Sequence, residues 1–255
     1  MDKTDRTVHA LVSEQFGPRA SAYVASAVHA QGEDLNELAA FARDRGLARA
    51  LDLGCGGGHV GFALAPHVGT VTAYDLSEAM LLAVAQEAVT RGIANLSTRQ
   101  GVVEALPFED ASFDFAATRY SAHHWHDVPR ALKEARRVLK PGGRAMVMDV
   151  YAPEAPLLDT FLQTVEMLRD PSHVRNYSLR EWAAMLRDAG FTPGEPVRRR
   201  IRLEFQSWIA RMQTPRVQAD AVLALQARVP KEVIEHFAVE RDGSFSIDTM
   251  SVEAA

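Results

Sequence analysis

The chain has 255 residues, of which 47% are hydrophobic and 24% are charged, and its formal net charge is -5. These values are typical of a globular chain with one apolar core, and they exclude a disordered or fibrous protein. The excess of acidic side chains gives no attraction for nucleic acid or an anionic membrane, so we expect neither as a partner. The sequence also contains no apolar run that could span a membrane. Its single cysteine, Cys55, cannot form an internal disulfide, which favours a cytoplasmic location.

Taken in chain order, the apolar pattern predicts an α/β fold. Residues 1–44 are expected to form an N-terminal helical cover. From residue 45 to residue 150, short apolar runs alternate with longer amphipathic stretches, which is typical of β-α-β units and a parallel sheet covered on both faces. The expected strands are 50–53, 71–74, a run around Leu96, 113–118 and 144–150.

Turn and capping residues mark the ends of these elements. Ser77 is a good N-cap for a helix that follows the second strand and ends near Gly92, where glycine tolerates the left-handed conformation. The run Pro141–Gly143 predicts a tight turn from the helix over 128–139 into the fifth strand.

The alternation of short apolar runs and amphipathic stretches ends after residue 150. Residues 151–178 are expected to form a lid insertion, and residues 179–255 to close the sheet through two antiparallel strands, 197–205 and 245–252, with a helical insertion at 207–239. We therefore predict one domain with a Rossmann-like, seven-stranded sheet that is mostly parallel, has an antiparallel last strand, and carries helices on both faces.

A glycine-rich turn follows the first strand and is the most informative segment. Gly56, Gly58 and Gly61 fit the pattern G-x-G-x-x-G, which makes a dinucleotide site one candidate. Asp52 favours a different ligand, because a carboxylate repels a pyrophosphate but attracts the ammonium group of a nucleotide that bears an amino acid. Asp75, at the end of the next strand, can accept hydrogen bonds from ribose hydroxyls in either case.

Four segments in order resemble a known family: LDLGCGGG (51–58), VTAYDLSEAML (71–81), GVVEALPFEDASFDFA (101–116) and KEARRVLKPGG (133–143). Together they resemble class I S-adenosylmethionine-dependent methyltransferases, and more narrowly the ubiquinone/menaquinone C-methyltransferase-like superfamily in the methyltransferase type 11 group. The resemblance covers roughly residues 45 to 150 and implies S-adenosylmethionine as cofactor and a small molecule as methyl acceptor.

The resemblance also implies roles for individual residues of the glycine turn and the second strand. The turn would hold the methionine end of the cofactor, the acid after the second strand would hold the ribose, and the next residue would lie against the adenine. The residues in these positions are Asp52, Gly54, Gly56, Gly58, Asp75 and Leu76.

Three further cofactor contacts follow from the resemblance. Val102 stands where many relatives carry an aspartate for the adenine amine, so the backbone of Val103 or Glu104 is expected to bind the adenine edge. Arg119, after the fourth strand, would lie near the methionine and the transferred methyl group. Tyr23 belongs to a segment that folds over the cofactor in relatives.

Histidines after the fourth strand are candidates for acid-base chemistry. Methyl transfer is an in-line displacement that needs a base only when the acceptor carries a proton, and histidine is the residue best suited to accept one near neutral pH. We expect His123 or His124 to orient or deprotonate the acceptor, with His173 closing from the lid. A structural role for these histidines is an open alternative, and no metal is expected because no metal-ligand spacing is present.

The acceptor site is expected to include Tyr120, with Arg175 or Arg119 holding an anionic group. An apolar lid favours C- or O-methylation of an aromatic or quinone-like acceptor; its residues are Leu157, Leu158, Phe161, Leu162 and Met167. Two alternatives stay open: a carboxyl O-methyltransferase for a carrier-bound acid, and a catalytically silent S-adenosylmethionine-binding protein. Neither acceptor identity nor oligomeric state follows from the sequence.

Overall fold

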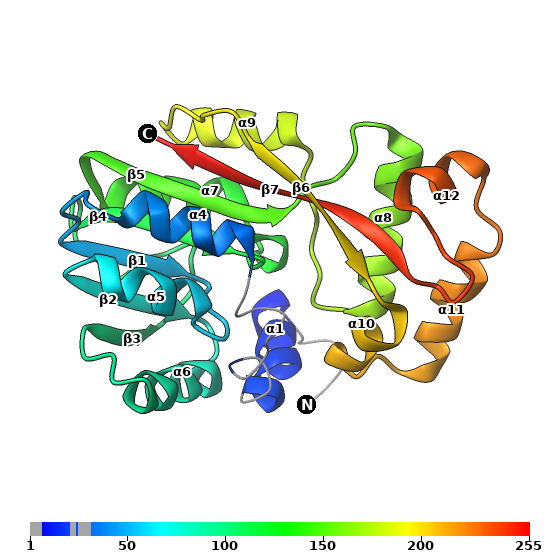
Figure 1. The fold of residues 1–255 in the computed structure, drawn as a ribbon, viewed down its shortest axis with the longest axis horizontal. Coiled ribbons are helices and arrows are strands. Elements are labelled where there is room, and N and C mark those ends of the chain that lie inside the picture. Colours follow the sequence, from blue (N-terminus) through cyan, green and yellow to red (C-terminus); the bar gives the residue numbers. More distant parts are fainter. Residues whose placement is uncertain (1–6, 21–23, 25–31) are drawn as a thin grey trace.

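The computed structural model describes residues 7–20, 24 and 32–255. Its centre is a seven-stranded sheet with the order β3-β2-β1-β4-β5-β7-β6 (Figure 1). The strands are β1 (Arg49–Leu53), β2 (Thr70–Asp75), β3 (Leu96–Gln100), β4 (Phe113–Arg119), β5 (Leu139–Val150), β6 (Val197–Leu203) and β7 (Phe245–Ala254).

The strand directions confirm the predicted sheet. Strands β1 to β5 pair in parallel, whereas β7 runs antiparallel to both β5 and β6. One local prediction was wrong, because Pro141–Gly143 lies within β5 and not before it. The register between β4 and β5 shifts there, so that Phe113 pairs with Leu139 but Phe115 pairs with Arg144. The glycines therefore form an irregularity in the strand, which takes up the extra residues.

Successive side chains of a strand point to opposite faces of the sheet, so a strand of mostly apolar residues presents apolar surface on both faces. Helices cover both of these faces. On one face, α4 (Glu33–Ala42) and α5 (His59–Leu64) pack with Ala50 and Val71. On the other, α7 (Val128–Val138) and α9 (Leu179–Asp188) pack with Leu51 and Leu53. The helix after β2, α6 (Glu78–Thr90), begins as predicted, because the Ser77 hydroxyl accepts a hydrogen bond from the backbone of Met80.

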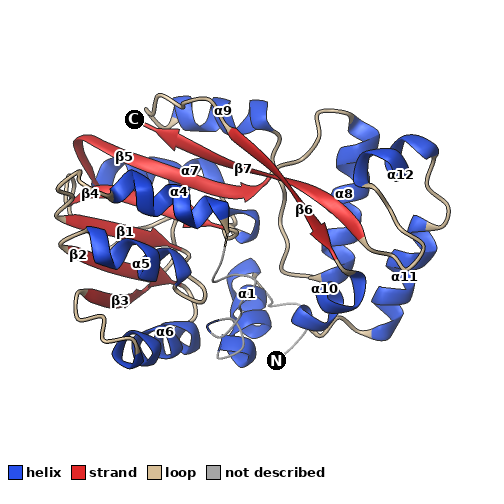
Figure 2. Ribbon diagram, in the orientation of Figure 1, coloured by secondary structure: helices blue, strands red, loops and turns tan. Residues whose placement is uncertain are grey.

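Four helices pack together around the end of β6 and the start of β7 (Figure 2). We call these four helices the helical lobe. They are α8 (Pro156–Arg169), α10 (Phe205–Met212), α11 (Arg216–Gln226) and α12 (Lys231–Phe237). Phe161 of α8 shares an apolar cluster with Trp208, Val222 and Phe237 of the other three helices. The segments expected as a lid and as a helical insertion thus pack on each other.

Helix α1 (Val8–Phe16) lies between the sheet and the helical lobe (Figure 1). The ring of Phe16 packs edge-on against His124 of the short turn η4 (Ala122–His124), with centroids 4.9 Å apart. On the other side, Arg19 in the turn η2 (Gly17–Arg19) donates to the Met212 carbonyl of α10 over 2.8 Å. A third short turn, η3 (Ala65–His67), follows α5. Within the described ranges, no helix has the length and apolar character to cross a membrane.

Candidate active site

A cavity of about 590 Å³ opens at the carboxyl ends of the parallel strands and is lined by residues of the sheet, α1 and the helical lobe. Ligands of open α/β sheets bind at this edge. Gly58, His173 and Arg175 are absent from its lining, and Tyr23 falls outside the described residues. The predicted site residues that do line it are Asp52, Gly54, Gly56, Asp75, Leu76, Val103, Glu104, Arg119, Tyr120, His123 and His124.

The glycine turn has its three alternate glycines in the left-handed region, with φ of +63° at Gly54, +47° at Gly56 and +77° at Gly58. A Cβ atom on Gly54 would lie 1.9 Å from the Ser121 hydroxyl, and one on Gly58 would lie 2.9 Å from Val84, so these two glycines allow packing within the protein. A Cβ on Gly56 would meet nothing within 4 Å. Gly56 is therefore the position where backbone is open to a ligand.

Asp52 is fixed at the end of β1 with one carboxylate oxygen unused. Its Oδ2 accepts a hydrogen bond from the Gly61 backbone over 2.9 Å, whereas Oδ1 is buried and has no hydrogen-bond partner among the described residues. Burial, with a smaller contribution from Asp75, raises the pKa of Asp52 to about 8. A buried, unpartnered carboxylate oxygen in a cavity wall is costly unless a donor is supplied to it.

Asp75 fastens the glycine turn to the start of α6. Its Oδ2 accepts from the Gly56 backbone over 2.8 Å and its Oδ1 accepts from the Ser77 backbone over 2.9 Å. Burial raises its pKa, although both backbone donors oppose the shift. Each oxygen keeps a second lone pair, so the side chain can also accept from a ligand on the cavity side.

The segment after β3, from Gly101 to Glu104, forms another part of the cavity wall. The Tyr74 hydroxyl donates to the Val102 carbonyl over 3.1 Å, which fixes this backbone. The Glu104 carboxylate accepts from the backbone of His126 over 3.0 Å and ties the wall to the loop before α7. Leu76 adds apolar surface to the same wall.

Arg119 is held by Asp34, an acid that no sequence motif had singled out. Its Nε lies 2.5 Å and its Nη2 3.1 Å from the two carboxylate oxygens of Asp34, and both side chains are nearly fully buried. The guanidinium also lies over the Tyr120 ring, 4.8 Å from its centroid. This bidentate pair connects α4 to the end of β4 at the cavity wall.

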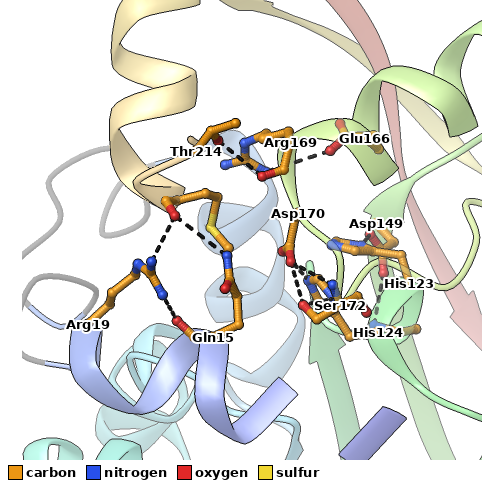
Figure 3. Close-up of polar contacts among 12 residues, drawn as sticks. Gln15, Arg19, His123, His124, Asp149, Glu166, Arg169, Asp170, Ser172 and Thr214 are labelled. Carbon is orange, nitrogen blue, oxygen red and sulfur yellow. Dashed lines mark hydrogen bonds and ion pairs between the residues drawn. The ribbon is translucent and has the colours of Figure 1, made fainter. Parts of the chain in front are cut away.

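His123 and His124 lie where β4 ends (Figure 3), and the ring of His173 lies near both. The rings of His123 and His124 have centroids 4.3 Å apart, and the ring of His173 lies 5.7 Å from that of His123. Burial and the neighbouring imidazoles lower the pKa of His124 to about 4 and that of His173 to about 2. Among the described residues, no three His, Cys, Asp or Glu side chains are placed to hold a metal ion.

His123 differs from its two neighbours because it has a carboxylate partner. Its Nδ1 lies 2.7 Å from Oδ1 of Asp149, which is buried near the end of β5. Burial lowers the pKa of His123, but the surrounding carboxylates, Asp149 first and then Glu166 and Asp170, together outweigh burial, and the net shift of the pKa is upward. Nε2 of His123 has no hydrogen-bond partner in the described part of the chain. Asp149 therefore orients the ring and fixes Nε2 as the proton acceptor.

His124 and His173 are held in other ways. The Nδ1 atom of His124 lies 3.1 Å from the Ser172 carbonyl, and Nε2 of His173 lies 3.0 Å from the Gln163 side-chain oxygen. Their lowered pKa values keep both rings neutral over the physiological range. They are therefore suited to packing and hydrogen bonding, and less suited than His123 to taking up a proton.

Arg175 points away from the cavity. Its guanidinium pairs with Asp159 at 3.1 Å and with Glu181 at 3.4 Å, and the side chain is 38% exposed. The pairing with two acids outside the cavity lining gives no support to Arg175 as a clamp for an anionic acceptor.

The apolar lid side chains are also placed differently from the expectation. Phe161 and Leu162 are buried within the helical lobe, while Leu157 and Met167 are exposed. None of the five lies in the cavity wall. Apolar surface on that side comes from other residues, whose place no sequence pattern indicated: Val150, Ile201, Leu203, Trp208, Met212 and Ile247.

Comparison with known proteins gives the family. Residues 51–147 match a family model described as a methyltransferase domain. The uncharacterized protein YafE of Escherichia coli is 49% identical over 193 residues, which are 76% of this chain and 93% of YafE. The uncharacterized methyltransferase YcgJ of Bacillus subtilis is 40% identical over 200 residues, which are 78% of this chain and 79% of YcgJ. The chain belongs to the S-adenosylmethionine-dependent methyltransferases.

The methyltransferase fold extends over most of the chain. The crystal structure of YcgJ aligns with a TM-score of 0.84 and 34% identity, covering 87% of this chain and 97% of that one. A 2-phytyl-1,4-naphtoquinone methyltransferase of Synechococcus elongatus is 39% identical over 121 residues, which are 45% of this chain and 51% of that enzyme. These findings confirm the resemblance drawn from the four sequence segments.

The cavity of this methyltransferase has features that fit S-adenosylmethionine. The unpartnered oxygen of Asp52 suits an ammonium group, the open backbone at Gly56 suits close approach of a ligand, and Asp75 can accept from ribose hydroxyls. No aspartate follows Gly101, so an adenine amine would depend on the backbone there.

Two acids of the site, Asp34 and Asp149, were not predicted from the sequence. A signal for Asp149 was present, since it is a carboxylate inside the apolar run 145–150.

Proposed function

We propose that this chain transfers a methyl group from S-adenosylmethionine to a carbon or oxygen atom of a small, planar acceptor, with His123 as the group that orients or deprotonates it. The observation that carries the proposal is that one continuous cavity is lined both by Asp52 and the open Gly56 and by His123. When bound, S-adenosylmethionine supplies an electrophilic methyl group on sulfur.

The cofactor half of the proposal assigns roles to residues of the sheet edge. Asp52 would hold the ammonium group, Gly54 and Gly56 would admit the methionine end, and Asp75 would hold the ribose. Leu76 and the backbone of Val103 and Glu104 would face the adenine. The order of these groups along the carboxyl ends of β1, β2 and β3 supports this assignment, because the three strands are adjacent in the sheet.

The acceptor half rests on His123 and the apolar wall. Asp149 holds Nδ1 of His123, so Nε2 is left to accept a proton from a hydroxyl group or an acidic carbon. Trp208 and Met212 of α10 provide flat and adaptable apolar surface on the lobe side of the same cavity. The similarity to a naphthoquinone methyltransferase agrees with an aromatic or quinone-like acceptor. Tyr120 would contact the acceptor through its ring.

Two other functions receive less support. The carboxyl O-methyltransferase alternative depended on Arg175 as a clamp, and that side chain pairs with Asp159 and Glu181. The catalytically silent alternative depended on Val102, but the ordered His123 and Asp149 pair has the geometry of an activated base.

The proposal is tested with wild type, His123→Asn and the control His67→Asn, which changes a histidine outside the cavity lining. Binding of S-adenosylhomocysteine is measured by calorimetry, and methylation of a panel of phenols, hydroquinones and enols by mass spectrometry. We expect all three proteins to bind with similar affinity, and His123→Asn to lose about 100-fold or more in kcat/KM, the usual contribution of a positioned base. Unchanged turnover in His123→Asn would refute the role of His123 as the base. Failure of the wild type to bind S-adenosylhomocysteine would refute the cofactor assignment.

The pH profile separates a base from a structural histidine. Because the pKa of His123 is raised, the neutral base is lost below a pH that lies above the ordinary value of 6.5, and kcat/KM should fall on that acidic side. Asp149→Asn removes the charge that raises this pKa, so the acidic limb should move to lower pH. A limb that stays in place would contradict the role of Asp149.

A further inference from the structure

Asn176 lies in the cavity wall with its side-chain amide unsatisfied. The residue is 2% exposed, and neither its Nδ2 nor its Oδ1 has a hydrogen-bond partner within residues 7–20, 24 and 32–255. Its backbone is firmly held, because Gln163 accepts from its N–H over 3.0 Å and donates to its carbonyl over 2.7 Å. A buried amide that lacks both a donor and an acceptor costs stability, and such groups are rare without a ligand or other partner.

The segment that carries Asn176 is attached to His123. The backbone N–H groups of Val174 and Arg175 donate to the His123 carbonyl over 2.8 and 3.3 Å. Asn176 follows immediately and lines the same cavity as His123. The amide therefore belongs to the acceptor half of the cavity, away from the glycine turn.

Arg169 adds a cation to the same half, at the end of α8 (Figure 3). Its Nε donates to the Trp208 carbonyl over 3.0 Å, and the guanidinium lies 5.0 Å from the centroid of the Trp208 ring. Its contact with the Glu166 carboxylate, at 3.6 Å from Nη1, is longer than a hydrogen bond, and Nη2 has no partner among the residues that the structure describes. The side chain is 14% exposed and lines the cavity.

Two other arginines of the cavity wall pair with acids at hydrogen-bond distance. Arg119 makes two hydrogen bonds to Asp34, and Arg200 donates to Asp248 over 2.9 Å. Burial raises the pKa of Glu166, which favours the neutral carboxyl and so weakens the electrostatic interaction of Glu166 with Arg169. Arg169 is thus placed to exchange a loose contact for a bidentate one with an anionic ligand.

We propose that the methyl acceptor is a planar carboxylic acid that carries a second oxygen group: its carboxylate binds Arg169, its ring packs on Trp208, and its carbonyl or hydroxyl group binds the Asn176 amide. This inference rests on the proposed methyl transfer and names the acceptor class. An amide that both donates and accepts matches a hydroxyl or carbonyl neighbour, and a guanidinium matches a carboxylate.

The test uses matched acids and primary amides, which have nearly the same shape and differ in charge. The pairs are 2-hydroxybenzoate, 3,4-dihydroxybenzoate and 1-hydroxy-2-naphthoate, each with its amide. Their binding to the full chain saturated with S-adenosylhomocysteine is measured by calorimetry. Their methylation is measured separately by mass spectrometry, with S-adenosylmethionine as the methyl donor. We expect at least one acid to bind about 10- to 100-fold more tightly than its amide, as one charge-assisted pair provides.

Variants assign the preference to Arg169. Arg169→Met should abolish the preference for the acid over its amide. Arg169→Lys should keep part of this preference, since lysine retains the positive charge but not the planar guanidinium that binds a carboxylate in a bidentate manner. Arg180→Met is the control, because this exposed arginine pairs with Glu154 and is absent from the cavity wall. Acids that bind no more tightly than their amides, or a preference that survives in Arg169→Met, would overturn the inference. If the acids fail in this way while the chain binds S-adenosylhomocysteine and methylates a phenol, hydroquinone or enol of the first panel, the proposed methyl transfer still stands and only the acceptor class is refuted.

Asn176→Leu provides a second readout that a structural residue would not give. Removing an unsatisfied buried amide should leave the melting temperature unchanged or raise it, while affinity for the preferred acid falls about tenfold. A lower melting temperature with unchanged acid affinity would show that Asn176 acts only in packing.

Discussion

The clearest quantitative prediction concerns Asp52, whose ionisation should control cofactor binding. Burial raises its pKa to about 8 in the ligand-free protein, so at pH 7 most molecules carry a neutral Asp52. An α-ammonium group is charged below about pH 8 and needs the anionic carboxylate as its partner. Binding must therefore release the Asp52 proton, and affinity should rise with pH through this range.

The size of the effect follows from the pKa. With a pKa of about 8, about 1% of Asp52 is ionised at pH 6 and about 9% at pH 7. S-adenosylhomocysteine should therefore bind about ninefold more tightly at pH 7 than at pH 6, a difference of about 1.3 kcal/mol. Above pH 8 the gain should level off, because the ligand ammonium begins to lose its own proton.

Titration calorimetry in two buffers of different ionisation enthalpy measures both the affinity and the protons released. We expect close to one proton released for each ligand bound at pH 6.5, and none in Asp52→Asn, which cannot ionise. Asp75→Asn is the matched control; it should weaken binding without removing the proton release that Asp52 causes. Equal affinity at pH 6 and pH 7 with no proton release from the wild type would refute the assignment of Asp52 to the ammonium group.

Three further predictions concern other parts of the site. Gly56→Val should cost about 1–2 kcal/mol of stability because of its positive φ, yet should abolish S-adenosylhomocysteine binding, since its side chain enters space that is open in the protein; calorimetry and thermal melting measure the two effects. Asp34→Ala should cost about 3–5 kcal/mol by leaving Arg119 buried without its carboxylate, and urea unfolding that shows less than 1 kcal/mol would contradict this. Phe161→Ala should cost about 3–5 kcal/mol and Leu157→Ala less than about 0.5 kcal/mol, because only the former is buried; similar losses would contradict the packing described for the helical lobe.

The sheet and its cofactor edge could be predicted because local signals coincide with the final structure. Ser77 caps α6 through its own hydroxyl, and Asp75 ends β2 beside the glycine turn, so neighbours in sequence decide the geometry. The alternation of short apolar runs gave all seven strands and the antiparallel β7. At the Pro141–Gly143 run the local signal indicated a turn before the fifth strand, but pairing with β4 already begins at Leu139, and the run forms the irregularity between Leu139 and Arg144.

The acceptor side could not be predicted to the same depth, because its contacts join residues far apart in the chain. His123 depends on Asp149, and Arg119 depends on Asp34, 85 residues away. The sequence could not show that Arg175 would be taken by Asp159 and Glu181. Composition of the lid suggested an apolar acceptor wall, but an amphipathic helix can turn its apolar face toward its own neighbours, as α8 does.

Helix α1 and the turn η2 that follows it contact both halves of the molecule. Phe16 of α1 packs against His124 on the sheet side. Arg19 of η2 donates to the Met212 carbonyl on the lobe side (Figure 3). The helix also lines the cavity through His9, Val12 and Phe16. If ligands enter and leave past this wall, α1 and η2 must first separate from the sheet or from the helical lobe. The rate of that separation would then set an upper limit on turnover, whatever the rate of the displacement reaction.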